Sequence, residues 1–155
     1  MKIGIIVQSR TGNTLSVAEK LKEKLASSGH RVNIERLKVL GDPKVSEKDV
    51  KFENLPDTGQ YDALIFGSAV EAFSLSAVMK QYLEEIGPLS GKKAACLVTK
   101  QLTFKWTGGT HAVSQMKKLC LAKGAEVLGS GIVVWGSSKR EENIDRAVDS
   151  LSGLF

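Results

Sequence analysis

The feature that most constrains the fold of this chain is its N-terminal segment, where an apolar run, a polar loop and a helix-like pattern follow one another. Residues 3–7 are branched aliphatics around one glycine, a composition typical of a buried strand. Apolar residues then recur at helical spacing, as Leu15, Ala18, Leu21 and Leu25, which predicts an amphipathic helix over residues 15–25. The residues between them therefore join the end of a strand to the N-terminus of a helix.

The joining loop contains three hydroxyl groups, an arginine, a glycine and an amide, in the order Ser9, Arg10, Thr11, Gly12, Asn13 and Thr14. Such a loop directs backbone N–H groups at one point, and the helix N-terminus adds partial positive charge there. The loop therefore predicts a site for an anion, typically a phosphate, to which the hydroxyls can donate further hydrogen bonds. The alternative is an ordinary helix cap, in which Asn13 or Thr14 satisfies the first turn. Neither Gly-Lys-Ser/Thr nor Gly-x-Gly-x-x-Gly occurs in the loop, which excludes an NTPase P-loop and a dinucleotide fingerprint.

The same segment resembles the N-terminal signature of the flavodoxin family. That signature asks for two aliphatic residues, an aromatic, a Ser or Thr, a small residue, a Thr, an Ala and an aliphatic at fixed spacing. The matching positions here are Ile5, Ile6, Val7, Ser9, Gly12, Thr14, Ala18 and Leu21. Only Val7 departs, because the family usually has Tyr or Phe there, and this position falls in the strand rather than in the loop. The resemblance implies FMN as the cofactor and electron transfer to redox partner proteins.

The composition is that of a water-soluble globular protein, with 42% apolar and 25% charged residues. A length of 155 residues fits a single domain, residues 1–155, with a substantial core. No apolar run approaches the roughly 20 residues that span a bilayer, so no membrane span is expected. Met1 leads straight into the first strand and leaves no room for a signal peptide, so a cytoplasmic location is expected by default.

The net charge is +5 and the sequence pI is about 9.2, which bears on partners rather than on the fold. The basic residues are spread along helices without interleaved aromatic residues, so nucleic-acid binding is not expected. Acidic redox partner proteins are one expectation for a basic chain. Cys96 and Cys120 lie in apolar surroundings and are expected to be buried free thiols. No cysteine or histidine spacing suggests ligands, so no metal is predicted.

Further along the chain, segments with the patterns of strands and helices alternate. Strands are predicted over residues 3–7, 32–37, 63–69, 93–99 and 127–135, and helices over 15–25, 76–86, 111–123 and 139–151. Residues 39–60 form a long connection, with a short helix expected near 47–52. This order predicts an α/β fold with helices on both faces of a doubly wound, five-stranded parallel sheet. The flavodoxin resemblance implies the strand order 2-1-3-4-5.

In a sheet of that order the ligand lies beyond the carboxyl ends of the strands, where the strand order reverses. Two further loops, residues 68–74 and 100–110, reach this point. A flat, partly apolar flavin ring requires apolar or aromatic faces and backbone polar groups. These two loops, together with Thr99 at the end of the strand that precedes the loop 100–110, are therefore predicted to hold the ring. The predicted residues are Ser68, Ala69, Val70, Glu71, Ala72, Phe73, Thr99, Lys100, Gln101, Phe104, Trp106, Gly108 and Gly109. The alternative is that Phe73 and Trp106 pack on the core beneath their loops, and that Lys100 is merely solvated.

The two loops differ in glycine content, and therefore in the backbone conformations that are expected of them. Gly108 and Gly109 permit close backbone approach. No glycine occurs between residues 68 and 86, so a turn that normally uses glycine would require an unfavourable backbone geometry in that segment.

The residues required for two other functions of similar folds are absent from this chain. A phosphorelay receiver domain needs aspartates at the ends of strands 1 and 3, where this chain has Gln8-Ser9 and Gly67-Ser68. A Gly-x-Ser-x-Gly nucleophile elbow is absent, and no catalytic residue is predicted. The leading hypothesis is an FMN-binding electron carrier, on the basis of the phosphate-loop match and the complete α/β order. The chain lacks an evident insertion that could build a nicotinamide pocket, which favours the carrier over an enzyme. The alternatives are an FMN-dependent NAD(P)H reductase or quinone oxidoreductase on the same fold, and a flavin-free binding module.

Overall fold

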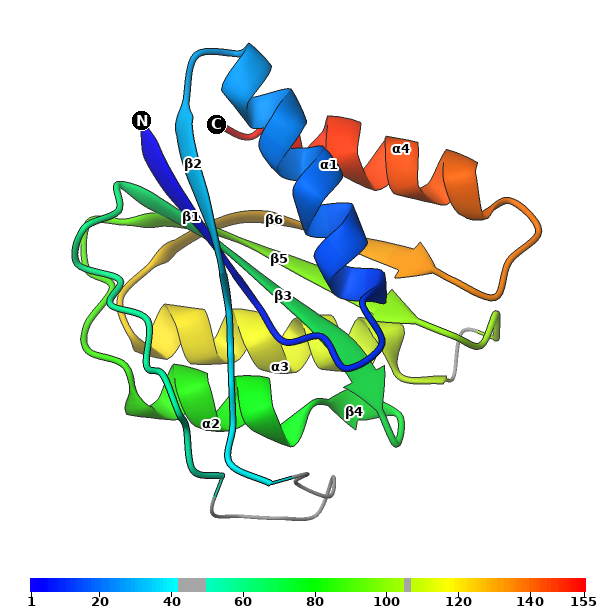
Figure 1. The fold of residues 1–155 in the computed structure, drawn as a ribbon, viewed down its shortest axis with the longest axis horizontal. Coiled ribbons are helices and arrows are strands. Elements are labelled where there is room, and N and C mark those ends of the chain that lie inside the picture. The colour runs from blue at the N-terminus through cyan, green and yellow to red at the C-terminus, as the bar shows by residue number, and fades with distance from the viewer. Residues whose placement is uncertain (42–49, 105–106) are drawn as a thin grey trace.

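The core of the protein is a parallel sheet, seen in a computed structural model that describes residues 1–41, 50–104 and 107–155. Its strands lie in the order β2-β1-β3-β5-β6 (Figure 1). Their bounds are β1 Lys2–Val7, β2 Arg31–Arg36, β3 Ala63–Glu71, β5 Lys93–Lys100 and β6 Glu126–Val134. All four pairings between these strands are parallel. Counted along the chain, the five long strands have the predicted order 2-1-3-4-5, so the predicted fold class is confirmed.

Helices cover both faces of this sheet, as Figure 1 shows. On one face lie α1 (Asn13–Ser27) and α4 (Arg140–Ser152), and on the other lie α2 (Ala77–Glu85) and α3 (Gly109–Ala122). Successive strand residues point to opposite faces. In β3, accordingly, Ile65 packs with the cluster under α1 and α4, and Phe66 packs with the cluster under α2 and α3. Burial on both faces explains why these strands are apolar runs rather than alternating patterns.

The glycines of β6 bring α4 close to the sheet. A Cβ on Gly129 would lie 2.9 Å from Leu154 Cδ1, and one on Gly131 would lie 3.3 Å from Leu151 Cδ1. Because neither glycine has a side chain, α4 can pack directly on the strand at Gly131, and the residues after the helix can do so at Gly129. This packing sets the start of α4 above the carboxyl end of the sheet.

Residues 68–74 were predicted to form a loop, and this prediction is wrong. Strand β3 continues to Glu71, and the short strand β4 (Ser74–Leu75) returns antiparallel along its end. The two residues between them, Ala72 and Phe73, have φ angles of 46° and 63°. A two-residue hairpin with positive φ at both positions is a type I′ turn, which suits the twist of the strands but normally requires glycine or asparagine. Hairpin pairing therefore outweighs the local backbone preference here.

Two smaller predictions also differ from the structure. Helix α3 begins at Gly109, two residues before its predicted start. The short helix expected near residues 47–52 falls mostly outside the described residues, and at its described end Phe52 instead forms an antiparallel bridge with Val39.

Cys96 and Cys120 are both free and fully buried, as predicted. A hydrogen bond with Cys96 and burial raise the pKa of the Cys120 thiol, which keeps it protonated and inert. In the described part of the chain, no helix has the length and apolar character needed to cross a membrane.

Candidate functional site

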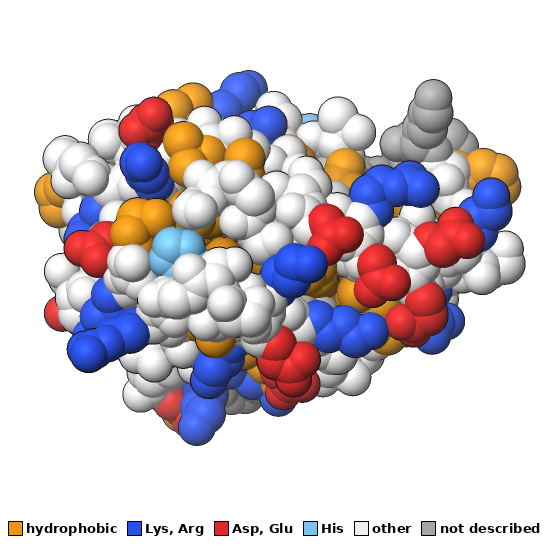
Figure 2. Space-filling view, turned by 90° about the horizontal axis from the view of Figure 1, so that it is seen from above, with side chains coloured by type: hydrophobic (Ala, Val, Ile, Leu, Met, Phe, Trp, Pro, Cys, Tyr) orange, Lys and Arg blue, Asp and Glu red, His pale blue; other side chains and the backbone are white. Residues whose placement is uncertain are grey.

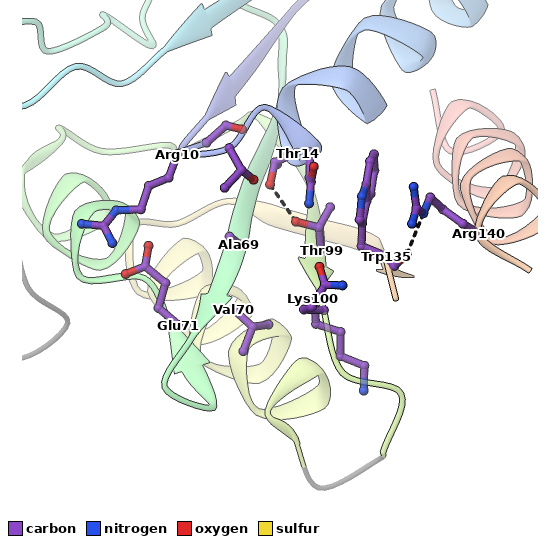
Figure 3. A pocket seen from close by; sticks show the side chains of 13 residues that line it. Arg10, Thr14, Ala69, Val70, Glu71, Thr99, Lys100, Trp135 and Arg140 are labelled. Atoms are coloured by element: carbon purple, nitrogen blue, oxygen red, sulfur yellow. Dashed lines mark hydrogen bonds between the residues drawn. The ribbon is translucent and has the colours of Figure 1, made fainter. Parts of the chain in front are cut away.

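A cavity of about 510 Å³ opens at the carboxyl ends of the central strands. Three segments that are distant in the sequence form its walls: the loop before α1, the ends of β3 and β5, and the segment that joins β6 to α4 (Figure 3). The lining residues are Ser9, Arg10, Thr11, Asn13, Thr14, Ala69, Val70, Glu71, Thr99, Lys100, Gln101, Trp135 and Arg140. This is the position at which ligands bind in doubly wound sheets, because the strand order reverses there.

The loop before α1 is held by the side chain of Ser9. Its Oγ accepts hydrogen bonds from the backbone N–H of Gly12 at 3.1 Å and of Leu15 at 3.3 Å. Gly12 is the N-cap of α1 with a φ of 91° and provides no side-chain cap. Ser9 therefore takes the capping role, rather than Asn13 or Thr14, which lie in the first turn. With both acceptor positions of its hydroxyl used, the O–H of Ser9 remains to donate.

Asn13 and Thr14 are the first two residues of α1. Their N–H groups belong to those that a helix leaves without an internal partner. The first bond of the helix runs from Ser16 N–H to the Gly12 carbonyl, at 2.9 Å. This end of the cavity therefore combines free backbone donors with the positive end of the helix dipole, which suits an anion.

A pair of threonine hydroxyls forms the floor beneath that end. Thr14 Oγ1 and Thr99 Oγ1 lie 2.8 Å apart, and both residues are almost fully buried. Gly67 makes room for the pair, because a Cβ there would lie 3.2 Å from Thr14 Cγ2. One hydroxyl donates to the other, so the pair retains one further O–H for a ligand.

A polar network fixes the end of β3. Gln8 Oε1 accepts from Ser68 Oγ at 3.2 Å and from Ala69 N–H at 3.1 Å, and Gln8 Nε2 donates to Glu71 Oε1 at 3.1 Å. Ser68 also bonds Ser76 Oγ at 2.8 Å and is fully buried. Ser68 points toward α2 because residues alternate along β3, so it supports the cavity from below and does not line it.

Alternation also separates the two residues at the end of β5. Thr99 faces α1, whereas Lys100 faces α3 and is only 9% exposed. Lys100 Nζ donates to the Phe104 carbonyl at 3.0 Å and to Thr107 Oγ1 at 3.3 Å. The Lys100 ammonium therefore holds the following loop in place rather than being solvated.

That loop packs directly on the β3–β4 turn. Gly108 has a φ of 99°, and a Cβ on it would overlap the backbone of Phe73. Between turn and loop lies a smaller cavity of about 160 Å³, lined by Val70, Ala72, Phe73, Lys100, Gln101, Leu102 and Thr107. The predicted close backbone approach at Gly108 is thus made to the protein's own turn.

The predicted site residues therefore fall into three groups. The structure brings eleven of them together on the main cavity: Ser9, Arg10, Thr11, Asn13, Thr14, Ala69, Val70, Glu71, Thr99, Lys100 and Gln101. Ala72 and Phe73 line the smaller cavity. Neither cavity is lined by Gly12, Ser68, Phe104, Gly108 or Gly109; the Phe104 residue is 60% exposed. Trp106 lies outside the described residues.

Sequence analysis missed Trp135 and Arg140 as site residues. Val133 packs under α1 and α4, so alternation along β6 places Trp135 on the same face, at the same edge of the sheet as Thr99. That alternation was the available signal for Trp135. Arg140, the first residue of α4, reaches the cavity only because that helix packs closely on β6, which the sequence did not reveal.

Comparison with solved structures shows the same fold at low sequence identity. Flavodoxin 2 from Bacillus cereus aligns over 100% of both chains with 21% identity and a TM-score of 0.69. A flavodoxin from Streptococcus pneumonia TIGR4 covers 100% of both chains at 16% identity and a TM-score of 0.67. A flavoprotein from Lactobacillus acidophilus NCFM, solved in complex with FMN, covers 94% of this chain and 97% of its own at 17% identity and a TM-score of 0.64.

A family-level match covers most of the chain. The model of the family described as NADPH-dependent FMN reductase matches residues 1–140. Together with the fold, this confirms the resemblance seen at residues 5–21 at the level of a flavodoxin-like, FMN-binding family. The chain belongs to the NADPH-dependent FMN reductase family.

Proposed function

We propose that this protein binds FMN in the main cavity and carries electrons between redox partners. The observation that supports this most directly is the group of donors at the start of α1, set at the topological switch point of the sheet. Ser9 shapes the loop, the first turn of α1 supplies N–H groups and the hydroxyl of Thr14, and the loop supplies the hydroxyl of Thr11. This donor set fits a phosphate.

The remaining walls fit the rest of the cofactor. Ala69 and Val70 offer apolar surface, and Gln101 offers a polar group for an edge of the ring. The volume of about 510 Å³ lies within the range typical of small-molecule sites. Bound FMN supplies one- and two-electron redox chemistry, and the protein supplies binding, orientation and electrostatics.

Hydrogen bonds within the protein position the charged side chains of the cavity. Gln8 holds Glu71 at the mouth, where Figure 3 shows its carboxylate and the guanidinium of Arg10 extending toward one another. Lys100 turns its ammonium away toward Phe104 and Thr107.

A second candidate function is NAD(P)H-dependent reduction through FMN, which the family match to FMN reductases favours. The carrier is preferred because the two smaller cavities that share lining residues with the main one have volumes of about 160 and 190 Å³. Both volumes are well below the roughly 300 Å³ at which ligand pockets begin, so neither cavity offers a nicotinamide a site of ordinary size.

Two measurements test these functions in turn. Titration with FMN, followed by absorbance and intrinsic fluorescence, should show saturable binding at micromolar protein; absence of binding with intact circular dichroism would refute the proposal and favour the flavin-free module. Steady-state oxidation of NADPH or NADH with a quinone or free flavin as acceptor then separates the two flavin functions. Turnover above about 1 s⁻¹, at the low end of enzyme rates, would favour the reductase.

The nature of the redox partner, its acidic surface and a cytoplasmic location stay predictions. The face that carries α1 and α4 mixes both signs of charge (Figure 2). Lys20 pairs with Glu141 at 3.1 Å and Lys24 with Asp149 at 3.2 Å across these two helices. An acidic partner would therefore approach another face of the protein.

A further inference from the structure

The segment from the end of β6 to the start of α4 supplies two side chains to the cavity that the flavodoxin-like signature does not include. These are Trp135 and Arg140. On the basis of the FMN site proposed above, we propose that they form a second clamp for the cofactor phosphate, opposite the loop before α1. Arg140 would supply a guanidinium to the phosphate oxygens, and Trp135 would supply its indole N–H and an apolar wall.

The side chain of Arg140 is held in place by Trp135. Its Nε donates to the Trp135 carbonyl at 2.6 Å, and its guanidinium carbon lies 4.8 Å from the centroid of the indole ring. These two contacts use Nε and one face of the guanidinium, and leave both Nη groups. Within residues 1–41, 50–104 and 107–155, the Arg140 side chain has no other hydrogen bond and no ion pair. A guanidinium with two N–H edges available matches the geometry of phosphate oxygens.

The positive charge of Arg140 does not stabilise the helix that carries it. It is the first residue of α4, where the helix dipole disfavours a cation. The acid beside it, Glu141, is directed to Lys20 instead, at 3.1 Å. The positive charge is therefore uncompensated among the described residues and lies on the wall of a cavity already suited to an anion. A phosphate monoester, with a charge of about −1.5 to −2 at neutral pH, would complement it.

Trp135 completes the wall. Figure 3 shows its indole between the side chains of Thr14 and Arg140. The residue is half-buried, and its indole N–H has no partner in the described part of the chain. Such groups normally find an acceptor when they are buried. A bound phosphate would provide one, and the indole would exclude water and so strengthen the charge interaction with Arg140.

The test compares FMN with riboflavin, which lacks the phosphate, by fluorescence titration of the full chain. Arg140→Ala should weaken FMN binding about tenfold, as expected for a lost charge-assisted hydrogen bond, and should change riboflavin binding less than about twofold. The matched control is Lys139→Ala, which removes the same charge from the residue just before Arg140, outside the cavity. It should leave both affinities within about twofold. Arg140→Lys should recover part of the loss, and Trp135→Phe should weaken FMN selectively by about threefold.

The outcomes separate the inference from the proposed function. If the unaltered protein does not bind FMN, both fail. If it binds FMN but Arg140→Ala matches Lys139→Ala, or weakens FMN and riboflavin equally, the phosphate clamp alone is overturned. Salt gives an independent readout, because removal of Arg140 should make FMN affinity less sensitive to ionic strength. An unchanged salt dependence would also overturn the clamp.

Discussion

The α1 wall of the cavity, residues 9–14 with Thr99, holds its shape through hydrogen bonds, whereas the turn wall, residues 71–74 packed on Gly108, holds its shape through close backbone contact. Residues of the α1 wall are protected: Ser9, Thr14 and Thr99 are at most 9% exposed. In the turn wall, Phe73 is 50% exposed and its backbone has a positive φ. The two walls should therefore respond differently to substitution.

The difference suggests a division of labour. Polar groups of the α1 wall are already bonded to one another through Ser9 and the two threonines, so little reorganisation is needed to bind an anion. The turn wall stores backbone strain in Ala72 and Phe73, and strain of this kind persists only where the surroundings enforce it. Affinity is therefore expected to depend on the α1 wall, and stability on the fit of the turn wall.

The largest expected effect is that of Gly108→Ala on stability. An added Cβ would overlap the Phe73 backbone and would also sit at a φ of 99°. Steric overlap and left-handed strain together should cost about 2–5 kcal/mol of unfolding free energy, measured by denaturant titration. The control is Gly87→Ala, where nothing lies within 4 Å and which should be nearly neutral. Equal stabilities for the two variants would show that the turn and the loop separate easily.

A smaller effect, on ligand affinity, is expected for the α1 wall. Thr14→Ala should weaken FMN binding by about 1.5–3 kcal/mol, or one to two decades, because a hydrogen bond to a charged phosphate is lost. Thr11→Ala combined with it should weaken binding further. Riboflavin affinity should not change in either variant. If the affinities for riboflavin and FMN fall equally, the loop serves only to cap the helix.

The matched control for Thr14 is Thr110. Both residues are second in helices whose N-caps are left-handed glycines, Gly12 and Gly108. Thr110 is exposed and does not line the cavity. Thr110→Ala should therefore leave FMN affinity unchanged.

Two glycine substitutions, one inside the α1 wall and one outside it, distinguish an effect of backbone strain from an effect on binding. Gly12 and Gly29 both have a φ of 91°, and a Cβ added to either would have nothing within 4 Å, so substitution by Ala adds strain without a clash. Each substitution should cost about 1–2 kcal/mol of stability. Only Gly12→Ala should also weaken FMN, because only Gly12 shapes the phosphate loop. Equal FMN affinities in the two variants would show that the loop tolerates distortion.

The same contrast explains what could be predicted from the sequence. The α1 wall is local, since its loop spans six consecutive residues and its chemistry follows from their types; the sheet order followed from the alternation of apolar runs and the resemblance. The turn wall depends on a contact between Phe73 and Gly108, which are far apart in the sequence. No local sequence pattern predicts a type I′ turn without glycine. Arg140 was missed for a similar reason, because its place depends on how closely α4 packs on β6 at Gly131.

The smallest expected effect tests whether the turn wall is strained at all. Ala72→Gly should raise the unfolding free energy by about 0.5–1 kcal/mol, because relief of left-handed strain worth about 1–2 kcal/mol outweighs the entropy cost of glycine, about 0.5–1 kcal/mol. Ala26→Gly is the control: Ala26 is an exposed residue within α1, so only the entropy cost applies and stability should fall. Denaturant unfolding of both variants should therefore show shifts of opposite sign. A loss of stability in Ala72→Gly equal to that in Ala26→Gly would mean that the hairpin holds Ala72 at positive φ without strain, and that the two walls differ in exposure alone.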